Sequence, residues 1–188
     1  MSRVAAIEPA QADASLKDLF ADFIRERGAV PNMFRTLAHD PKLLQTWFDM
    51  FRATLREGEV TTRVKEMVAV RVSHLNQSRY CLGSHTGLAK RFGVTEAQVS
   101  CLLDASAATF TPAEQAAISF GEELTRNPAG VSDATFAELR KHWNERQIVE
   151  IAAVACMFNS FNRFNNALGV DLTVYPKSLD AKPPGACS

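Results

Sequence analysis

The sequence repeats signals for the start of a helix and contains almost no signals for a strand. Three segments match the capping box, in which a Thr or Asn side chain caps a backbone amide and a residue three positions later reaches back. They are Thr95 with Gln98, Thr111 with Glu114, and Asn144 with Gln147. No β-branched run alternates with polar residues between Gly or Asn turns. The pattern therefore predicts an all-α protein.

Apolar residues at helical spacing and local helix breakers place the other helices. They are predicted to cover about residues 12–27, 41–55, 62–76, 79–92 and 133–143. Residues 29–39 are expected to form a short loop between the first two. Together with the capping boxes, this gives a bundle of about eight helices.

Length and composition exclude several classes of protein. The 188 residues are 46% hydrophobic and 22% charged, which suffices for one buried core. Because 21 basic residues balance 21 acidic ones, no net field attracts nucleic acid or an anionic membrane. No apolar stretch reaches the roughly 20 residues that span a bilayer, and residues 1–10 lack the pattern of a signal peptide. We expect a cytoplasmic protein with one domain at residues 1–180 and a flexible tail at 181–188.

The four cysteines lie too far apart for a disulfide framework or a pair of zinc-binding CxxC motifs, so free thiols are expected. Cys101 and Cys156 have apolar neighbours, which is typical of small core residues, and Cys187 belongs to a Pro-rich end. No metal site is expected, because no carboxylate lies at ligand spacing beside Cys81 and His85.

Residues 76–85 contain the most informative side chains. If Ser78 caps a helix, Cys81 occupies the third helical position, where free amides and the helix dipole favour a thiolate. The pKa of Cys81 should then fall. His85 lies one turn further along the same face. The alternative is that both are ordinary core residues, which is the more common outcome for such a short pattern.

Glu66 is the second informative residue. It lies in a segment, residues 64–75, that is apolar nearly all round, so its carboxylate is expected to be buried and to need a partner. A buried carboxylate suits proton transfer near neutral pH. The structural alternative is an ion pair with Arg63, Arg71 or an arginine elsewhere.

Three short motifs stand in a characteristic order: Arg63-x-x-Glu66, Tyr80-Cys81-x-x-x-His85 and Ala89-x-x-x-Gly93. This order resembles the carboxymuconolactone decarboxylase family, whose other branch is the alkylhydroperoxidase D-like proteins. The likeness extends to residues 30–34, 39–41, 149–150 and 163–169. It implies an all-helical fold without a cofactor that assembles as trimers or hexamers, with sites near subunit contacts.

The resemblance to the peroxidase branch implies that Glu66, Cys81 and His85 are the catalytic residues. The chain departs from that branch at two positions, because Ser78 replaces the first motif cysteine and Tyr80 replaces a histidine. Without the resolving thiol, a sulfenate on the remaining cysteine has to be reduced by an external thiol or by one of the two cysteines at positions 101 and 156.

The decarboxylase branch commonly has an acidic residue where this chain has Cys81. The residues that the two branches share, Glu66 and His85, are suited to acid–base chemistry on a lactone or a related carboxylic acid. Arg163, in a later polar helix face, is a candidate for binding a substrate carboxylate. The residues at positions 78 and 80 are further candidates for substrate binding or proton relay.

Three functions follow. In the first, a Cys81 thiolate attacks a hydroperoxide while Glu66 and His85 relay the proton; a thiol pKa well below about 8.5 favours this function. In the second, the same carboxylate and imidazole carry out decarboxylation, hydration or isomerisation of a lactone or carboxylic acid; an ordinary or raised thiol pKa favours it. In the third, a helical oligomer binds a small apolar ligand or simply assembles, with no chemistry.

Overall fold

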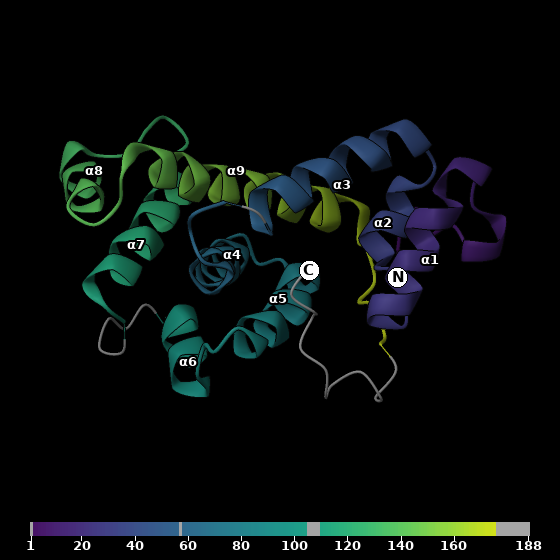
Figure 1. Ribbon diagram of the computed structural model, residues 1–188, viewed down its shortest axis with the longest axis horizontal. Helices are drawn as coiled ribbons and strands as arrows, with labels where there is room; N and C mark the ends of the chain where they lie inside the picture. Colours follow the sequence, from purple (N-terminus) through teal and green to yellow (C-terminus); the bar gives the residue numbers. More distant parts are fainter. Residues whose placement is uncertain (1, 57, 105–109, 176–188) are drawn as a thin grey trace. The chain divides into compact units, whose positions relative to one another are not determined.

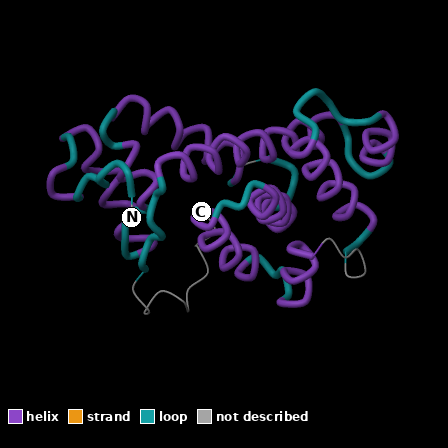
Figure 2. The backbone as a smooth tube through the Cα atoms, turned by 180° about the vertical axis from the view of Figure 1, so that it is seen from behind, coloured by secondary structure: helices purple, strands orange, loops and turns teal. Residues whose placement is uncertain are grey.

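The computed structural model describes residues 2–56, 58–104 and 110–175, and within these ranges it is helical without strands (Figures 1 and 2). Two short 3-10 helices, Pro9–Gln11 and Ala14–Leu16, precede nine α-helices in this part of the chain. The α-helices are α1 (Lys17–Arg27), α2 (Asn32–Leu37), α3 (Pro41–Leu55), α4 (Thr62–Leu75), α5 (Arg79–Arg91), α6 (Glu96–Asp104), α7 (Pro112–Arg126), α8 (Asp133–Arg140) and α9 (Glu145–Leu168). The all-α prediction is confirmed.

The chain divides into two compact units. The first comprises Met1–Met50 and Leu168–Ser188, and the second comprises Phe51–Ala167. The boundaries fall inside α3 and at the last residue of α9. One domain over residues 1–180 stays a prediction, and the predicted tail lies outside the described residues. No helix of the described ranges is long and apolar enough to cross a membrane.

Side-chain caps begin the helices where the sequence predicts them. The Oγ1 atom of Thr61 accepts from the amide of Val64 at the start of α4, and Ser132 caps α8 in the same way. All three predicted capping boxes form with both of their hydrogen bonds. Gly28 ends α1 with a φ of +72°, a left-handed conformation that favours glycine.

The predicted loop at residues 29–39 is wrong, because α2 lies within it. Pro31 precedes this helix with a φ of −58°, which suits the entry to a first turn. Met33, Phe34 and Leu37 are buried on one face, and the Phe34 ring stacks on Phe23 with centroids 5.1 Å apart. Packing of these side chains stabilises a helix that is too short to be stable by itself.

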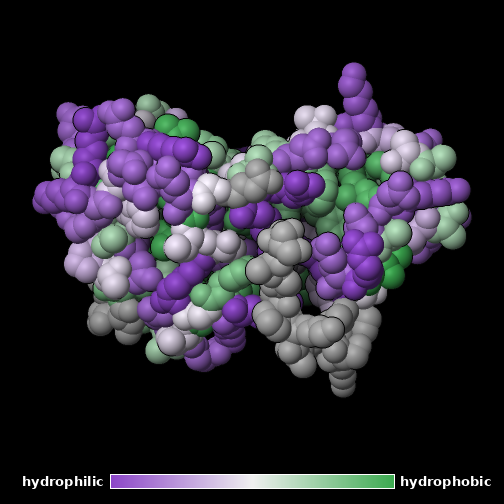
Figure 3. All heavy atoms as spheres, viewed as in Figure 1, coloured by the Kyte–Doolittle hydropathy of each residue, from purple (hydrophilic) through white to green (hydrophobic). Residues whose placement is uncertain are grey.

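Helix α4 is the central helix of the second unit. Every residue from Val64 to Ser73 is buried, and Figure 1 shows α4 end-on with α5, α6, α7 and α9 around it. Helix α7 approaches it closely at Gly121, where an added Cβ would lie 2.9 Å from a methyl carbon of Val68. On the outside of the unit, Figure 3 shows hydrophilic side chains covering most of the face over α7 and α8. Because the residues of α4 from Val64 to Ser73 are all buried, Glu66 lies in the interior of this unit.

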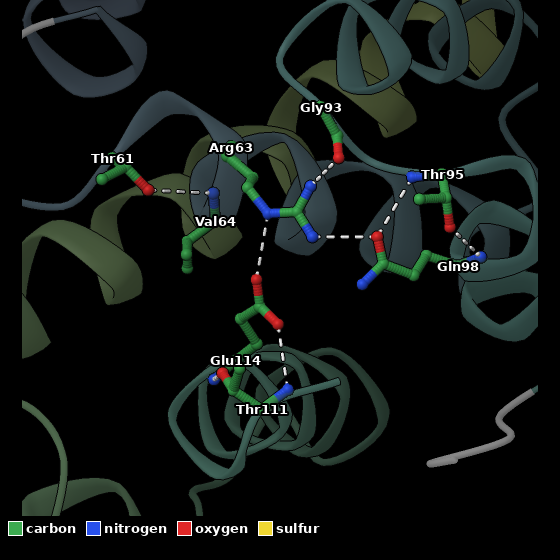
Figure 4. A network of polar contacts seen from close by, with 8 residues as sticks. All are labelled: Thr61, Arg63, Val64, Gly93, Thr95, Gln98, Thr111 and Glu114. Carbon is green, nitrogen blue, oxygen red and sulfur yellow. Dashed lines mark hydrogen bonds and ion pairs between the residues drawn. The ribbon is translucent and has the colours of Figure 1, made fainter. Parts of the chain in front are cut away.

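Arg63, in the first turn of α4, binds the ends of three other helices (Figure 4). Its guanidinium donates from Nε to Glu114 Oε1 at 3.0 Å, from Nη2 to Gln98 Oε1 at 2.8 Å, and from Nη1 to the Gly93 carbonyl. The side chains of Glu114 and Gln98 complete the capping boxes at the starts of α7 and α6, and Gly93 lies just after the end of α5. One side chain thus fixes the start of α4, one turn before Glu66.

Arg63→Ala is expected to lower the free energy of unfolding by about 1–3 kcal/mol, because it leaves several acceptors without their donor. Urea denaturation of the whole protein measures this change. Arg63→Lys should restore only part of the loss, since an ammonium lacks the planar fork of a guanidinium. Arg25→Ala is the control: its side chain is 69% exposed and pairs with Asp22 on the surface, so a change below about 0.5 kcal/mol is expected. Equal losses in Arg63→Ala and Arg25→Ala would contradict the role of Arg63.

Candidate active site

Helices α4, α5 and α9 bring together two of the predicted catalytic residues. Glu66 on α4 is fully buried, and His85 on α5 is 8% exposed. The Nδ1 atom of His85 lies 2.7 Å from Glu66 Oε2, a hydrogen-bond distance. The ring of Phe158, on α9, meets the His85 ring edge-to-face with centroids 4.6 Å apart. The imidazole is therefore held in one orientation by a carboxylate and an aromatic ring.

The hydrogen bond constrains what each nitrogen of His85 can do. An ionised Glu66 accepts only, so with this charge state neutral His85 carries its proton on Nδ1 and Nε2 is a proton acceptor. The second oxygen of Glu66, Oε1, is buried and has no hydrogen-bond partner among the described residues. Buried polar atoms are nearly always satisfied, and exceptions often mark functional sites. The pair is thus suited to accept a proton at Nε2 while Glu66 stabilises the imidazolium.

The arginines that offered a structural explanation for Glu66 bind other acceptors. Arg63 binds the helix ends described above, and the buried Arg71 donates to Glu122 at 2.8 Å and to the Leu102 carbonyl at 2.8 Å. Glu66 is therefore held by His85.

Cys81 lies on α5, one turn before His85, and is 2% exposed. Ser78 is the N-cap residue, which places Cys81 at the predicted third position of the helix. The Ser78 side chain, however, makes no capping hydrogen bond. The sulfur accepts a hydrogen bond from Asn165 Nδ2 of α9 at 3.4 Å. Cys81 is thus enclosed by its own helix and by α9.

The predicted fall in the pKa of Cys81 is wrong. Burial raises the pKa of this thiol, and the hydrogen bond from Asn165 and the nearby polar side chains of Ser78, Asn162 and Ser73 only partly oppose the rise. The prediction considered the amides and dipole of α5, whereas loss of hydration disfavours the thiolate more strongly. At neutral pH the resting sulfur carries its proton.

The remaining predicted site residues lie in different environments. Tyr80 is buried in α5 next to Cys81. Arg163 is exposed, and its Nη1 donates to the carbonyl and to Oδ1 of Asn159 in its own helix, at 2.9 and 2.7 Å. Binding of a substrate carboxylate by Arg163 stays a prediction.

The other described cysteines are free thiols outside the core. Cys101 is half-buried, and Cys156 is exposed, so the prediction of two core cysteines is wrong. Cys156 lies seven residues after the exposed Val149, which is two turns along the same outer face of α9. Cys187 lies outside the described residues. Within the described ranges, no group of three or more His, Cys, Asp or Glu residues is placed to hold a metal ion.

Sequence reasoning did not connect with Cys81 the polar residues that lie near it. Ser73 lies two turns after Glu66 on α4, and Asn162 and Asn165 lie four and seven residues after Phe158 on α9. All three are at most 2% exposed. The signal was present in the sequence, because helical spacing places these polar residues on the same faces as buried ones.

The second unit is all-helical, and within it a buried carboxylate–imidazole pair lies one helical turn from a buried thiol. Residues 41–123 match the carboxymuconolactone decarboxylase family. The chain is 30% identical over 131 residues to the uncharacterized protein YdfG of Bacillus subtilis, covering 69% of this chain and 88% of that protein. The chain belongs to the carboxymuconolactone decarboxylase family.

A more distant relative and two solved structures extend these comparisons. An alkyl hydroperoxide reductase of Mycobacterium tuberculosis is 28% identical over 112 residues, which are 60% of this chain but only 33% of that protein. A peroxidase-related protein of Ralstonia eutropha with an alkylhydroperoxidase core has a TM-score of 0.84, 26% identity and 92% coverage of both chains. The debrominase Bmp8 has a TM-score of 0.79, 23% identity, and coverage of 94% and 95%, and shares the fold.

Proposed function

We propose that this protein is a thiol-dependent oxidoreductase that reduces a hydroperoxide. Cys81 is the nucleophile, and the Glu66–His85 pair accepts its proton. One observation carries the proposal: the buried 2.7 Å contact between Glu66 and His85 lies one helical turn from a sulfur that is enclosed among hydrogen-bond donors. The alkyl hydroperoxide reductase and the peroxidase-related protein among the similar proteins support the same chemistry.

The raised pKa of Cys81 makes a base necessary, because the resting thiol is protonated. Nε2 of His85 takes the thiol proton, directly or through water, and Glu66 stabilises the imidazolium. The sulfur then attacks the terminal oxygen of the hydroperoxide and the O–O bond breaks. Two electrons pass from sulfur to oxygen, Cys81 becomes a sulfenic acid, and the alcohol leaves with the proton from His85.

Regeneration of the Cys81 thiol requires a thiol from outside the α5 motif, either an external reductant or Cys101 or Cys156, because Ser78 stands where a resolving cysteine would lie and a hydroxyl forms no disulfide. One thiol condenses with the sulfenic acid of Cys81, forming a mixed disulfide and releasing water. A second thiol attacks this disulfide, releases Cys81 and leaves as the oxidised reductant.

Sulfenic acid formation tests this function. Protein mixed with one equivalent of cumene hydroperoxide, without reductant, should consume about one equivalent and then yield a dimedone adduct on the peptide that contains Cys81. Because the sulfur is buried, the reaction is quenched into urea that contains dimedone. The control sample receives cumyl alcohol in place of the hydroperoxide. Undiminished hydroperoxide together with an unmodified Cys81 peptide would rule the function out.

A second candidate is cofactor-free acid–base chemistry on a lactone or related carboxylic acid, as the family name suggests. The raised pKa of the Cys81 thiol and the unpartnered Oε1 of Glu66 favour it. Here His85 and Glu66 move a substrate proton, and Cys81 takes no part. The debrominase structure, which holds 2,3,4-tribromopyrrole and has a cysteine replaced by alanine, illustrates that one fold serves different substrates.

A further inference from the structure

A row of buried amides on α9 faces the sulfur of Cys81. Asn165 is 2% exposed, and its Nδ2 lies 3.4 Å from the sulfur. Asn162, one turn earlier and fully buried, donates from Nδ2 to Ser73 Oγ at 3.1 Å and accepts at Oδ1 from Asn76 Nδ2 at 3.0 Å. Burying an amide is costly unless its polar atoms are paired. The orientation of Asn162 is thus fixed by α4 and the turn after it, and Asn165 directs a donor at the reacting atom.

A donor directed at sulfur favours one charge state of Cys81. A thiol is a weak acceptor, whereas hydrogen bonds to an ionised group are shorter and about twice as strong as neutral ones. The side chains that lower the pKa of Cys81 are Ser78, Asn162, Asn165 and Ser73, and all four are neutral. In this buried site, neutral donors therefore take the place of a nearby cation.

We propose that Asn165 is a catalytic residue, whose side-chain amide stabilises the negative charge that develops on the Cys81 sulfur as its proton leaves. Asn162 is a positioning residue, which fixes α9 against Ser73 so that this donor faces the sulfur. The inference rests on the proposed function, in which Cys81 is deprotonated. It adds α9 to a site whose other members lie on α4 and α5.

Alkylation of Cys81 by iodoacetamide tests the role of Asn165 without any substrate. The other cysteines are replaced (Cys101→Ser, Cys156→Ser, Cys187→Ser), so that Cys81 is the only thiol. Because only the thiolate reacts and its pKa is raised, the rate should increase with pH through and beyond 9. With Asn165→Leu the midpoint should move further up, and the rate at pH 8 should fall about tenfold, as expected for loss of a hydrogen bond to a charged group.

Two further variants make the result decisive. Asn166→Leu is the matched control, because this neighbouring amide is exposed and donates to the Asn76 carbonyl, so the midpoint should stay unchanged. Asn165→Asp keeps the size of the side chain and replaces the donor by an acceptor, so it should raise the midpoint even if Asn165→Leu does not fold. Circular dichroism verifies that each variant is helical. A midpoint that is unchanged in Asn165→Asp would overturn the inference.

The inference and the proposed function fail in different ways. If the protein consumes hydroperoxide but the midpoint of Cys81 alkylation is the same in the Asn165 variants as in the parent protein, peroxide reduction stands and the donor role is refuted. If the variants shift the titration but no hydroperoxide is consumed, the donor role stands and peroxide reduction is refuted. If both hold, Asn165→Leu should lower kcat/KM for hydroperoxide about tenfold, in parallel with the thiolate fraction.

Discussion

Replacement of Cys81 by serine is expected to lower the rate of hydroperoxide consumption by about a thousandfold or more, the usual cost of losing a catalytic nucleophile. A serine oxygen cannot be oxidised to the equivalent of a sulfenic acid, so the first half of the cycle is lost. The fold should persist, because serine is close in shape to cysteine and its hydroxyl can accept the hydrogen bond from Asn165. The loss of cumene hydroperoxide, measured with dithiothreitol as reductant, reports this rate.

The matched control is Cys156→Ser, which changes an exposed thiol on the outer face of α9. Single-turnover consumption of hydroperoxide should be unchanged in this variant. A Cys81→Ser protein that keeps most of its turnover of a lactone or carboxylic acid, while His85→Ala loses it, would instead establish the acid–base function.

Glu66→Gln should reduce kcat by about 10²- to 10⁴-fold, the range in which general acid–base catalysis contributes. Glutamine keeps the shape of the side chain and an oxygen that accepts from His85 Nδ1, but it cannot stabilise an imidazolium by its charge. The free energy of unfolding should change by no more than about 1 kcal/mol, since the variant also removes the cost of a buried charge. Steady-state kinetics and urea denaturation of the same preparation measure both quantities.

Glu145→Gln is the control for this variant, because the side chain of Glu145 is 91% exposed. It should leave both the rate and the stability as they are. If Glu66→Gln is as active as the parent, the buried pair has a structural role only. A non-catalytic helical protein would then be the better description.

The boundaries of many helices could be predicted because the residues that cap them act locally. The boxes at Thr95, Thr111 and Asn144 and the cap at Thr61 depend only on residues within one turn, and the structure contains all of them. Helix α2 was missed because it has six residues and is stabilised by packing that no local pattern reveals.

The candidate site was only partly predictable for a similar reason. The apolar segment around Glu66 and the helical spacing of His85 after Cys81 singled out these two residues, and the family resemblance implied their catalytic role; the structure brings them to 2.7 Å. The sign of the Cys81 pKa shift depends on how completely other helices exclude water, which is a property of the tertiary structure. The donor Asn165 is 84 residues away in the sequence, so only the packing of α9 brings it to the sulfur.

The contacts of the Arg63 guanidinium affect how this unit unfolds. The guanidinium ties the ends of α5, α6 and α7 to the first turn of α4, three residues before Glu66. Fraying at any of these helix ends therefore loosens the segment that carries the carboxylate. Local unfolding and displacement of the Glu66 carboxylate are coupled through one side chain, so resistance to heat and the geometry of the Glu66–His85 pair depend on the same contacts.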